Sequence, residues 1–179
     1  MTPDEDLGRL LDRRTLTWER DLTVDADTLW QAIATRDGLA HWFMPTDTEI
    51  EEGGRFSFTG GWDGTVTRVE PGRLVEFTPD AAEGASLRFE LEETDAGFRF
   101  RLTDTMAPDA DASALFGDDT AAVQKHQPGG PGTHWSGVAA GYHGFVDALV
   151  AHLAGTEATF DYDAMARTYV DLLDRWHGA

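Results

Sequence analysis

The residue that most suggests a binding role is an arginine that interrupts an apolar strand face. Residues 15–24 alternate apolar and polar side chains, which is the pattern of a half-buried strand. Arg20 falls on the apolar face together with Leu22. Because a guanidinium that faces a core needs a partner, we expect Arg20 to pair either with a carboxylate near the sheet edge or with the anionic group of a ligand.

Two histidines lie next to aromatic residues and could border a pocket. His41 precedes Trp42, and His143 follows Tyr142. An imidazole gains and loses its proton near neutral pH, so both histidines are candidate acid-base groups. The alternative is that each is a partly exposed histidine with a structural hydrogen bond.

The histidines near the C-terminus do not have the spacing of a metal site. His134, His143 and His152 are nine residues apart in a predicted helix. Successive members therefore lie on opposite helix faces, and the outer two are ~27 Å apart. The sequence has no cysteine, and it lacks a phosphate-binding loop, a nucleophile elbow and a dinucleotide fingerprint. We expect no metal and no cofactor.

Glycine-containing turns divide residues 49–106 into strands. The pairs at 63–64 and 71–72 predict hairpins, and the pair at 53–54 predicts a bulge or a sharp bend. For the last hairpin, with a loop at 94–97, a single register pairs apolar residues on the inner face and opposite charges on the outer face. Leu91 lies opposite Phe100 and Phe89 opposite Leu102 on the inner side, with Glu92 opposite Arg99 and Glu90 opposite Arg101 on the outer side.

Helices are expected on both sides of these strands. Asp25 is a candidate N-cap for a short helix, and a break at 37–38 separates this helix from a second short one. A long helix at 134–154 is stopped by Gly155, and another amphipathic helix follows Asp161. The apolar stripe of the long helix consists of Trp135, Val138, Tyr142, Phe145, Val146, Leu149 and Leu153.

Residues 107–132 form a long segment rich in Asp, Ala, Gly and Pro. Loops of this length are usually lids, binding loops or disordered segments. Leu115 and Phe116 could close over a pocket, whereas the composition favours a flexible acidic insertion.

The charge balance restricts the class of partner. The chain has 179 residues and a formal net charge of -19. Such a surface repels nucleic-acid phosphates and anionic lipid headgroups, so we expect neither a nucleic-acid nor a membrane partner. The acidic start of the chain and the lack of a long apolar stretch favour a cytoplasmic location.

The order of these elements resembles the helix-grip, or START-like, fold. The sequence is similar to the branch of the SRPBCC superfamily related to the activator of heat-shock protein 90 ATPase, although Tyr142 replaces a tryptophan and the proline before the first helix is absent. The similarity rests on three blocks, which are Arg20, Leu22, Leu29, Trp30, Ala32, Ile33, Leu39, Trp42, Phe43 and Pro45, then Glu49 to Phe56, then Gly141, Tyr142, Leu149, Leu153 and Gly155.

The resemblance implies an α+β fold in which a curved antiparallel sheet of about six strands wraps around the long helix. We expect an acidic extension at 1–14, able to form a helical turn, a START-like domain at 15–155 and an additional helix within 156–179.

A bent sheet that wraps one helix tends to leave an apolar gap, so our leading hypothesis is the binding of a small hydrophobic or aromatic ligand without assigned catalysis. The resemblance leaves two alternatives, a co-chaperone that contacts a heat-shock protein 90 ATPase and a cyclase or dehydratase that uses His41 or His143. We expect a monomer or a homodimer. The candidate cavity residues are Arg20, Trp42, Phe43, Phe58, Trp62, Phe100, Tyr142 and Phe145.

Overall fold

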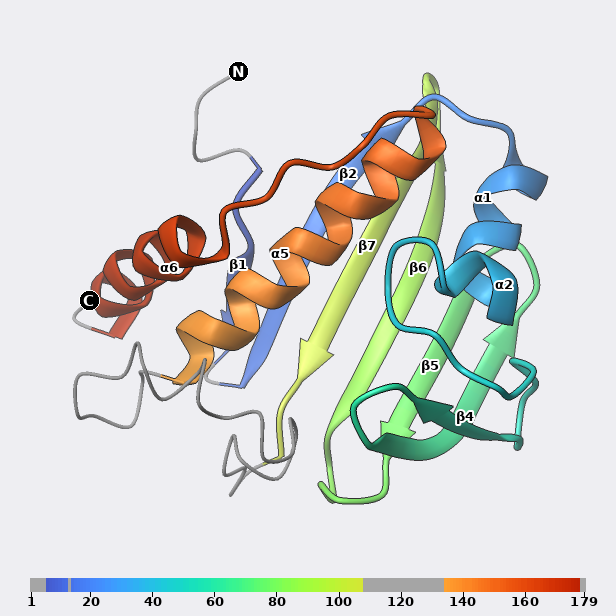
Figure 1. The fold of residues 1–179 in the computed structure, drawn as a ribbon, viewed down its shortest axis with the longest axis horizontal. Coiled ribbons are helices and arrows are strands. Elements are labelled where there is room, and N and C mark those ends of the chain that lie inside the picture. The colour runs from blue at the N-terminus through green and yellow to red at the C-terminus, as the bar shows by residue number, and fades with distance from the viewer. Residues whose placement is uncertain (1–5, 13, 108–133, 178–179) are drawn as a thin grey trace.

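The computed structural model describes residues 6–12, 14–107 and 134–177, which form one antiparallel sheet with helices on its inner face (Figure 1). The sheet has seven strands in the order β1-β2-β7-β6-β5-β4-β3. This is the predicted helix-grip fold with one more strand than expected. The strands are β1 Arg9–Asp12, β2 Thr15–Leu22, β3 Arg55–Phe58, β4 Trp62–Glu70, β5 Leu74–Pro79, β6 Ser86–Thr94 and β7 Gly97–Thr105.

The N-terminal extension contributes a strand where we expected a helical turn. Arg9–Asp12 pairs with the edge of β2, whose backbone groups would otherwise lack partners on that side. The Arg9 guanidinium also binds the Glu19 carboxylate on the neighbouring strand, at 2.9 Å. Tertiary pairing therefore overrides the local helical tendency of this segment.

The hairpin of β6 and β7 has the predicted register on both faces. Phe89 pairs with Leu102 and Leu91 with Phe100, while Glu90 and Glu92 lie opposite Arg101 and Arg99. The predicted turn at Pro71 and Gly72 is also present, between β4 and β5. Gly72 has a φ of 76°, a conformation that glycine adopts readily.

The hairpin predicted at Asp63 and Gly64 is wrong, because both residues lie inside β4. The chain turns earlier, at Gly60 and Gly61, which have φ values of 102° and 82°. Gly64 has a different role inside the strand, where a residue with a side chain would clash with its neighbours. A Cβ atom there would lie 2.2 Å from the carbonyl oxygen of Thr78 and 2.7 Å from the Phe56 ring.

Four helices complete the described fold. They are α1 Ala26–Ala34, α2 Arg36–Leu39, α5 His134–Leu153 and α6 Tyr162–His177. Asp25 caps α1 as predicted, accepting a hydrogen bond of 2.8 Å from the Thr28 amide. The break between α1 and α2 lies at Thr35 and not at the predicted 37–38, because the Thr35 hydroxyl caps α2 by accepting from the Gly38 amide at 3.0 Å.

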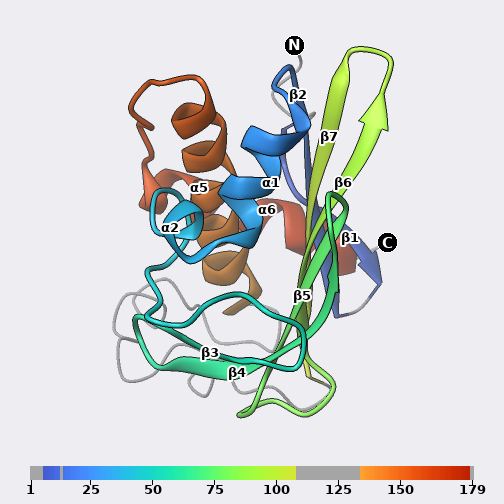
Figure 2. The ribbon, with the colours of Figure 1, turned by 90° about the vertical axis from the view of Figure 1, so that its right-hand side faces the viewer.

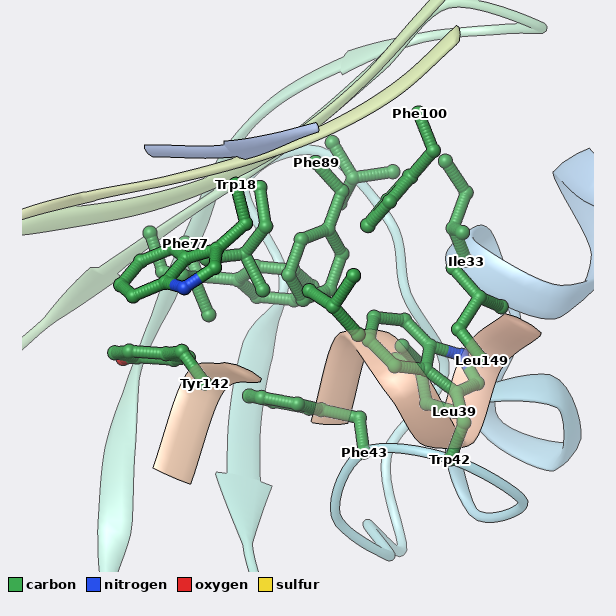
Figure 3. Packing of buried hydrophobic residues seen from close by; sticks show 14 of the residues in the cluster. Trp18, Ile33, Leu39, Trp42, Phe43, Phe77, Phe89, Phe100, Tyr142 and Leu149 are labelled. Atoms are coloured by element: carbon green, nitrogen blue, oxygen red, sulfur yellow. The ribbon is translucent and has the colours of Figure 1, made fainter. Parts of the chain in front are cut away.

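Helices α1, α2 and α5 lie on the same side of the sheet (Figure 2). Aromatic side chains of the inner strands meet those of α5 and of the segment after α2 (Figure 3). The Trp42 ring, for example, packs on the Phe89 ring with 5.1 Å between their centroids. Its indole nitrogen also donates to the Ala32 carbonyl at 2.9 Å. The core therefore occupies the space between the sheet and these helices.

Substitution of Gly64 tests this packing. Gly64→Ala should lower the free energy of unfolding by ~2 kcal/mol, because the added methyl group overlaps the Thr78 carbonyl and the Phe56 ring. Thr67→Ala, at an exposed position of the same strand, should change it by less than ~1 kcal/mol. Urea unfolding of both variants measures the difference, and an equal effect would contradict the packing described for Gly64.

Candidate functional site

A cavity of about 240 Å³ lies between the N-terminal half of α5 and one end of the sheet, where β4 and β6 begin and β5 and β7 end. Three glycines and several apolar side chains form most of its wall. The lining residues are Met44, Thr59, Gly60, Trp62, Pro79, Ala85, Ser86, Asp104, Thr105, Met106, Gly137, Val138, Gly141, Tyr142, Phe145 and Tyr162.

Small residues on α5 leave room for this cavity. Gly137 and Gly141 are one helical turn apart and both line the cavity. A Cβ atom added at Gly141 would meet no other atom within 4 Å. Farther along the same helix, Val146 and Leu149 are fully buried in the core. The helix therefore fills the concave face at one end and leaves it open at the other.

A buried acid is the most polar feature of the cavity wall. Asp104 continues the inner face of β7 after Phe100 and Leu102 and is only 8% exposed. The Tyr142 hydroxyl donates to its Oδ1 at 3.3 Å. Burial raises the pKa of Asp104 to about 7, against the opposing effect of this hydrogen bond. The same burial and the neighbouring acid raise the pKa of Tyr142.

Arg20 has a carboxylate partner, which lies on α5. Its guanidinium donates to Oδ1 of Asp147 at 3.0 Å and to the Glu19 carbonyl at 2.9 Å, and its side chain is 11% exposed. Partial burial opposes the ionisation of Asp147, but hydrogen bonds from His143 and Arg20 outweigh it and hold the pKa of Asp147 below its usual value. Arg20 borders a separate polar groove and does not line the cavity.

His143 belongs to a hydrogen-bond network centred on Tyr169 of α6. The Tyr169 hydroxyl accepts from the Gly8 amide and from the Trp18 indole, both at 2.7 Å. Its own hydrogen is then left for Nδ1 of His143, at 3.0 Å. Nε2 of His143 faces the Asp147 carboxylate at 3.3 Å, so this nitrogen carries the imidazole hydrogen. Burial raises the pKa of Tyr169 to about 12.

The second candidate acid-base residue, His41, is exposed and lies outside the cavity. Its ring stacks on that of His152, with 4.6 Å between ring centroids. Within the described ranges, no group of three or more histidine, aspartate or glutamate side chains is placed to hold a metal ion.

The structure places the predicted cavity residues in three environments. Trp62, Tyr142 and Phe145 line the cavity. Arg20, His41 and His143 make the contacts described above, outside the cavity wall. Trp42, Phe43, Phe58 and Phe100 are buried in the aromatic core next to the cavity and do not line it. Leu115 and Phe116 of the proposed lid fall outside the described residues.

Sequence reasoning missed Asp104, although a signal was present. The alternation that places Phe100 and Leu102 on the inner face also places Asp104 there. An acid in that position is as unusual as the inward arginine on β2, and it indicates a buried polar contact for the same reason.

Comparison with known families fits this architecture. Residues 23–153 match the model of a family described as activator of Hsp90 ATPase homolog 1-like protein. The chain belongs to this family. It is thus a member of the SRPBCC superfamily, as the three sequence blocks implied. No curated protein matches the chain.

Several solved structures resemble this member of the activator of Hsp90 ATPase homolog 1-like family. CalU16 from Micromonospora echinospora is 16% identical, with a TM-score of 0.64 over 93% of this chain and 94% of CalU16. A conserved protein of unknown function from Enterococcus faecalis is 15% identical, with a TM-score of 0.67 over 95% and 91% of the two chains. DynU16, a protein of the dynemicin biosynthetic locus, is 18% identical, with a TM-score of 0.62 over 84% of this chain and 51% of DynU16.

At these identities the likeness supports the fold alone. Of the helices that the structure describes, none has the length and apolar character needed to cross a membrane.

The network around Tyr169 should make a measurable contribution to stability. Tyr169→Phe removes the acceptor of two N–H groups, those of Gly8 and Trp18, and should lower the free energy of unfolding by about 2 to 3 kcal/mol. Tyr162→Phe is the matched control, because its hydroxyl makes one partly buried hydrogen bond to the Gly137 carbonyl and its loss should cost ~1 kcal/mol. Equal losses in chemical denaturation would argue against the network.

Asp104 should give the stability a distinctive pH dependence. Its pKa is about 7 when folded and near 3.8 when unfolded, so the folded protein binds the extra proton between these values. Wild-type stability should therefore fall relative to that of Asp104→Asn as the pH rises through this window, and stay level above it. The relative change is on the order of 4 kcal/mol at most, at about 1.4 kcal/mol per pKa unit. Parallel stability curves for the two proteins would contradict the buried acid.

Proposed function

We propose that this protein binds a small hydrophobic or aromatic molecule in the cavity between α5 and the sheet. The observation that carries the proposal is an apolar cavity with few polar groups, which is the usual form of a small-molecule site. Trp62, Tyr142 and Phe145 offer it three aromatic rings, contributed by the sheet and by α5.

The size of the cavity supports a ligand larger than one ring. A cavity of roughly 150 Å³ lined by aliphatic side chains is known to accommodate benzene in another protein. The cavity described above has a volume of about 240 Å³. A two-ring compound or a branched aliphatic molecule is therefore a reasonable size class. The turn at Thr59 and Gly60, which is exposed and lines the cavity, gives a route of entry.

The alternative of a cyclase or dehydratase that uses a histidine receives less support. Such an enzyme needs an imidazole within hydrogen-bond reach of the bound substrate. His143 is held between Tyr169 and Asp147, and His41 stacks on His152, so neither lines the cavity. The co-chaperone alternative rests on the family description, and it would use an exposed surface instead of a cavity.

The proposal can be tested by filling the cavity from α5. The neutral fluorescent probe N-phenyl-1-naphthylamine should bind the wild-type protein with increased emission. Gly141→Leu should weaken this binding at least tenfold, because its side chain grows into open cavity space. Gly141→Ala is the matched control, since it makes the same helix more stable by ~1 kcal/mol but adds a single methyl group.

Thermal melts of both variants establish that the fold is retained. The proposal fails if the wild-type protein does not bind the probe, or if Gly141→Leu binds it as strongly as Gly141→Ala does.

A further inference from the structure

We infer that the natural ligand is an apolar amine, whose cationic nitrogen is held by the Asp104 carboxylate at the cavity wall. This inference rests on the proposed function, because it concerns the ligand of the same cavity. It adds a chemical class to a ligand that was so far defined only by its apolar surface and its size.

The geometry leaves part of the Asp104 carboxylate free to bind. Oδ1 accepts from the Tyr142 hydroxyl at 3.3 Å, and among the described residues Oδ2 accepts no hydrogen bond. An ionised carboxylate has about four lone-pair sites and donates nothing, so one long hydrogen bond satisfies little of its capacity. A buried carboxylate with so few donors is costly, unless a ligand supplies the missing charge and hydrogen bonds.

No cation of the described chain fills this role. The other titratable groups on the cavity wall are Tyr142 of α5 and Tyr162 of α6, and no lysine, arginine or histidine among the described residues lines it. Arg14 binds the Met106 carbonyl at the strand end, but its side chain is exposed. Arg20 is paired with Asp147 and does not line the cavity.

Two features favour a cation over a neutral hydrogen-bond acceptor. The net charge of -19 attracts cations from solution and repels anions. Trp62, Tyr142 and Phe145 line the same space, and an aromatic ring can stabilise an ammonium group placed over its face. A neutral ketone or ester would instead need a protonated Asp104 as its donor. The two cases predict opposite pH dependences, which makes them separable.

The experiment compares two competitors of the same size. 1-Naphthylmethylamine and 1-naphthylmethanol are used to displace N-phenyl-1-naphthylamine at about pH 8, where Asp104 is ionised. The amine should bind the wild-type protein at least tenfold more tightly than the alcohol. Asp104→Asn should abolish this preference while the alcohol keeps its affinity, because the amide retains the shape of the carboxylate but not its charge.

The pH profile of the wild-type protein gives an independent measurement that needs no variant. Affinity for the amine should rise from about pH 5 to about pH 8 as Asp104 loses its proton, while affinity for the alcohol stays level. Equal binding of amine and alcohol, or binding that weakens as the pH rises, overturns the inference of an amine but leaves the apolar cavity in place. Failure of the fluorescent probe itself to bind overturns the proposed function.

Discussion

The packing of α5 on the concave face of the sheet is the constraint on which the other features depend. Val146 and Leu149 are fully buried in the core, and the Phe145 ring, which borders the cavity, packs 4.7 Å from the Phe43 ring between centroids. Toward its N-terminal end the helix presents Gly137 and Gly141, which cannot reach the opposite strands. A helix with large side chains along its whole inner face would close the fold completely. The alternation of bulky and small residues on one helix face thus creates the core and the cavity together.

Polar groups buried beside α5 fall into two kinds, which differ in how completely they are paired. Arg20, Asp147, His143 and Tyr169 satisfy one another across three elements, β2, α5 and α6. These contacts link the three elements through a connected polar network. Asp104 has one long hydrogen bond and no cationic partner among the described residues. The difference in pairing, and not the difference in residue type, separates a structural polar group from a candidate binding group.

Sequence patterns predicted the parts of the fold that local rules determine. The register of β6 and β7 could be predicted because one alignment of the strands pairs apolar residues on the inner face and Glu with Arg on the outer face. The cap at Asp25 could be predicted because its carboxylate can accept from a backbone amide of the first helical turn. The prediction of a turn at 63–64 was wrong because the glycine was taken as a sign of turn geometry. Gly64 lies inside β4, where the absence of a side chain leaves space for the Thr78 carbonyl and the Phe56 ring. Such a reason depends on the neighbouring strands, which single-sequence reasoning does not place.

The cavity residues were harder to predict, because alternation identifies an inward side chain but not what lies opposite to it. Phe100 and Asp104 share the inner face of β7, yet one is enclosed by rings of the core and the other lines open space. Asp104 lies beside Tyr142 of α5 at the cavity, whereas the Phe100 ring packs against those of Trp42 and Phe89. In this protein the inward acid of β7 lines the cavity, whereas four of the predicted aromatic residues are taken up by the core. Alternation alone does not separate these two outcomes, because it does not tell which inward positions face the small residues of α5.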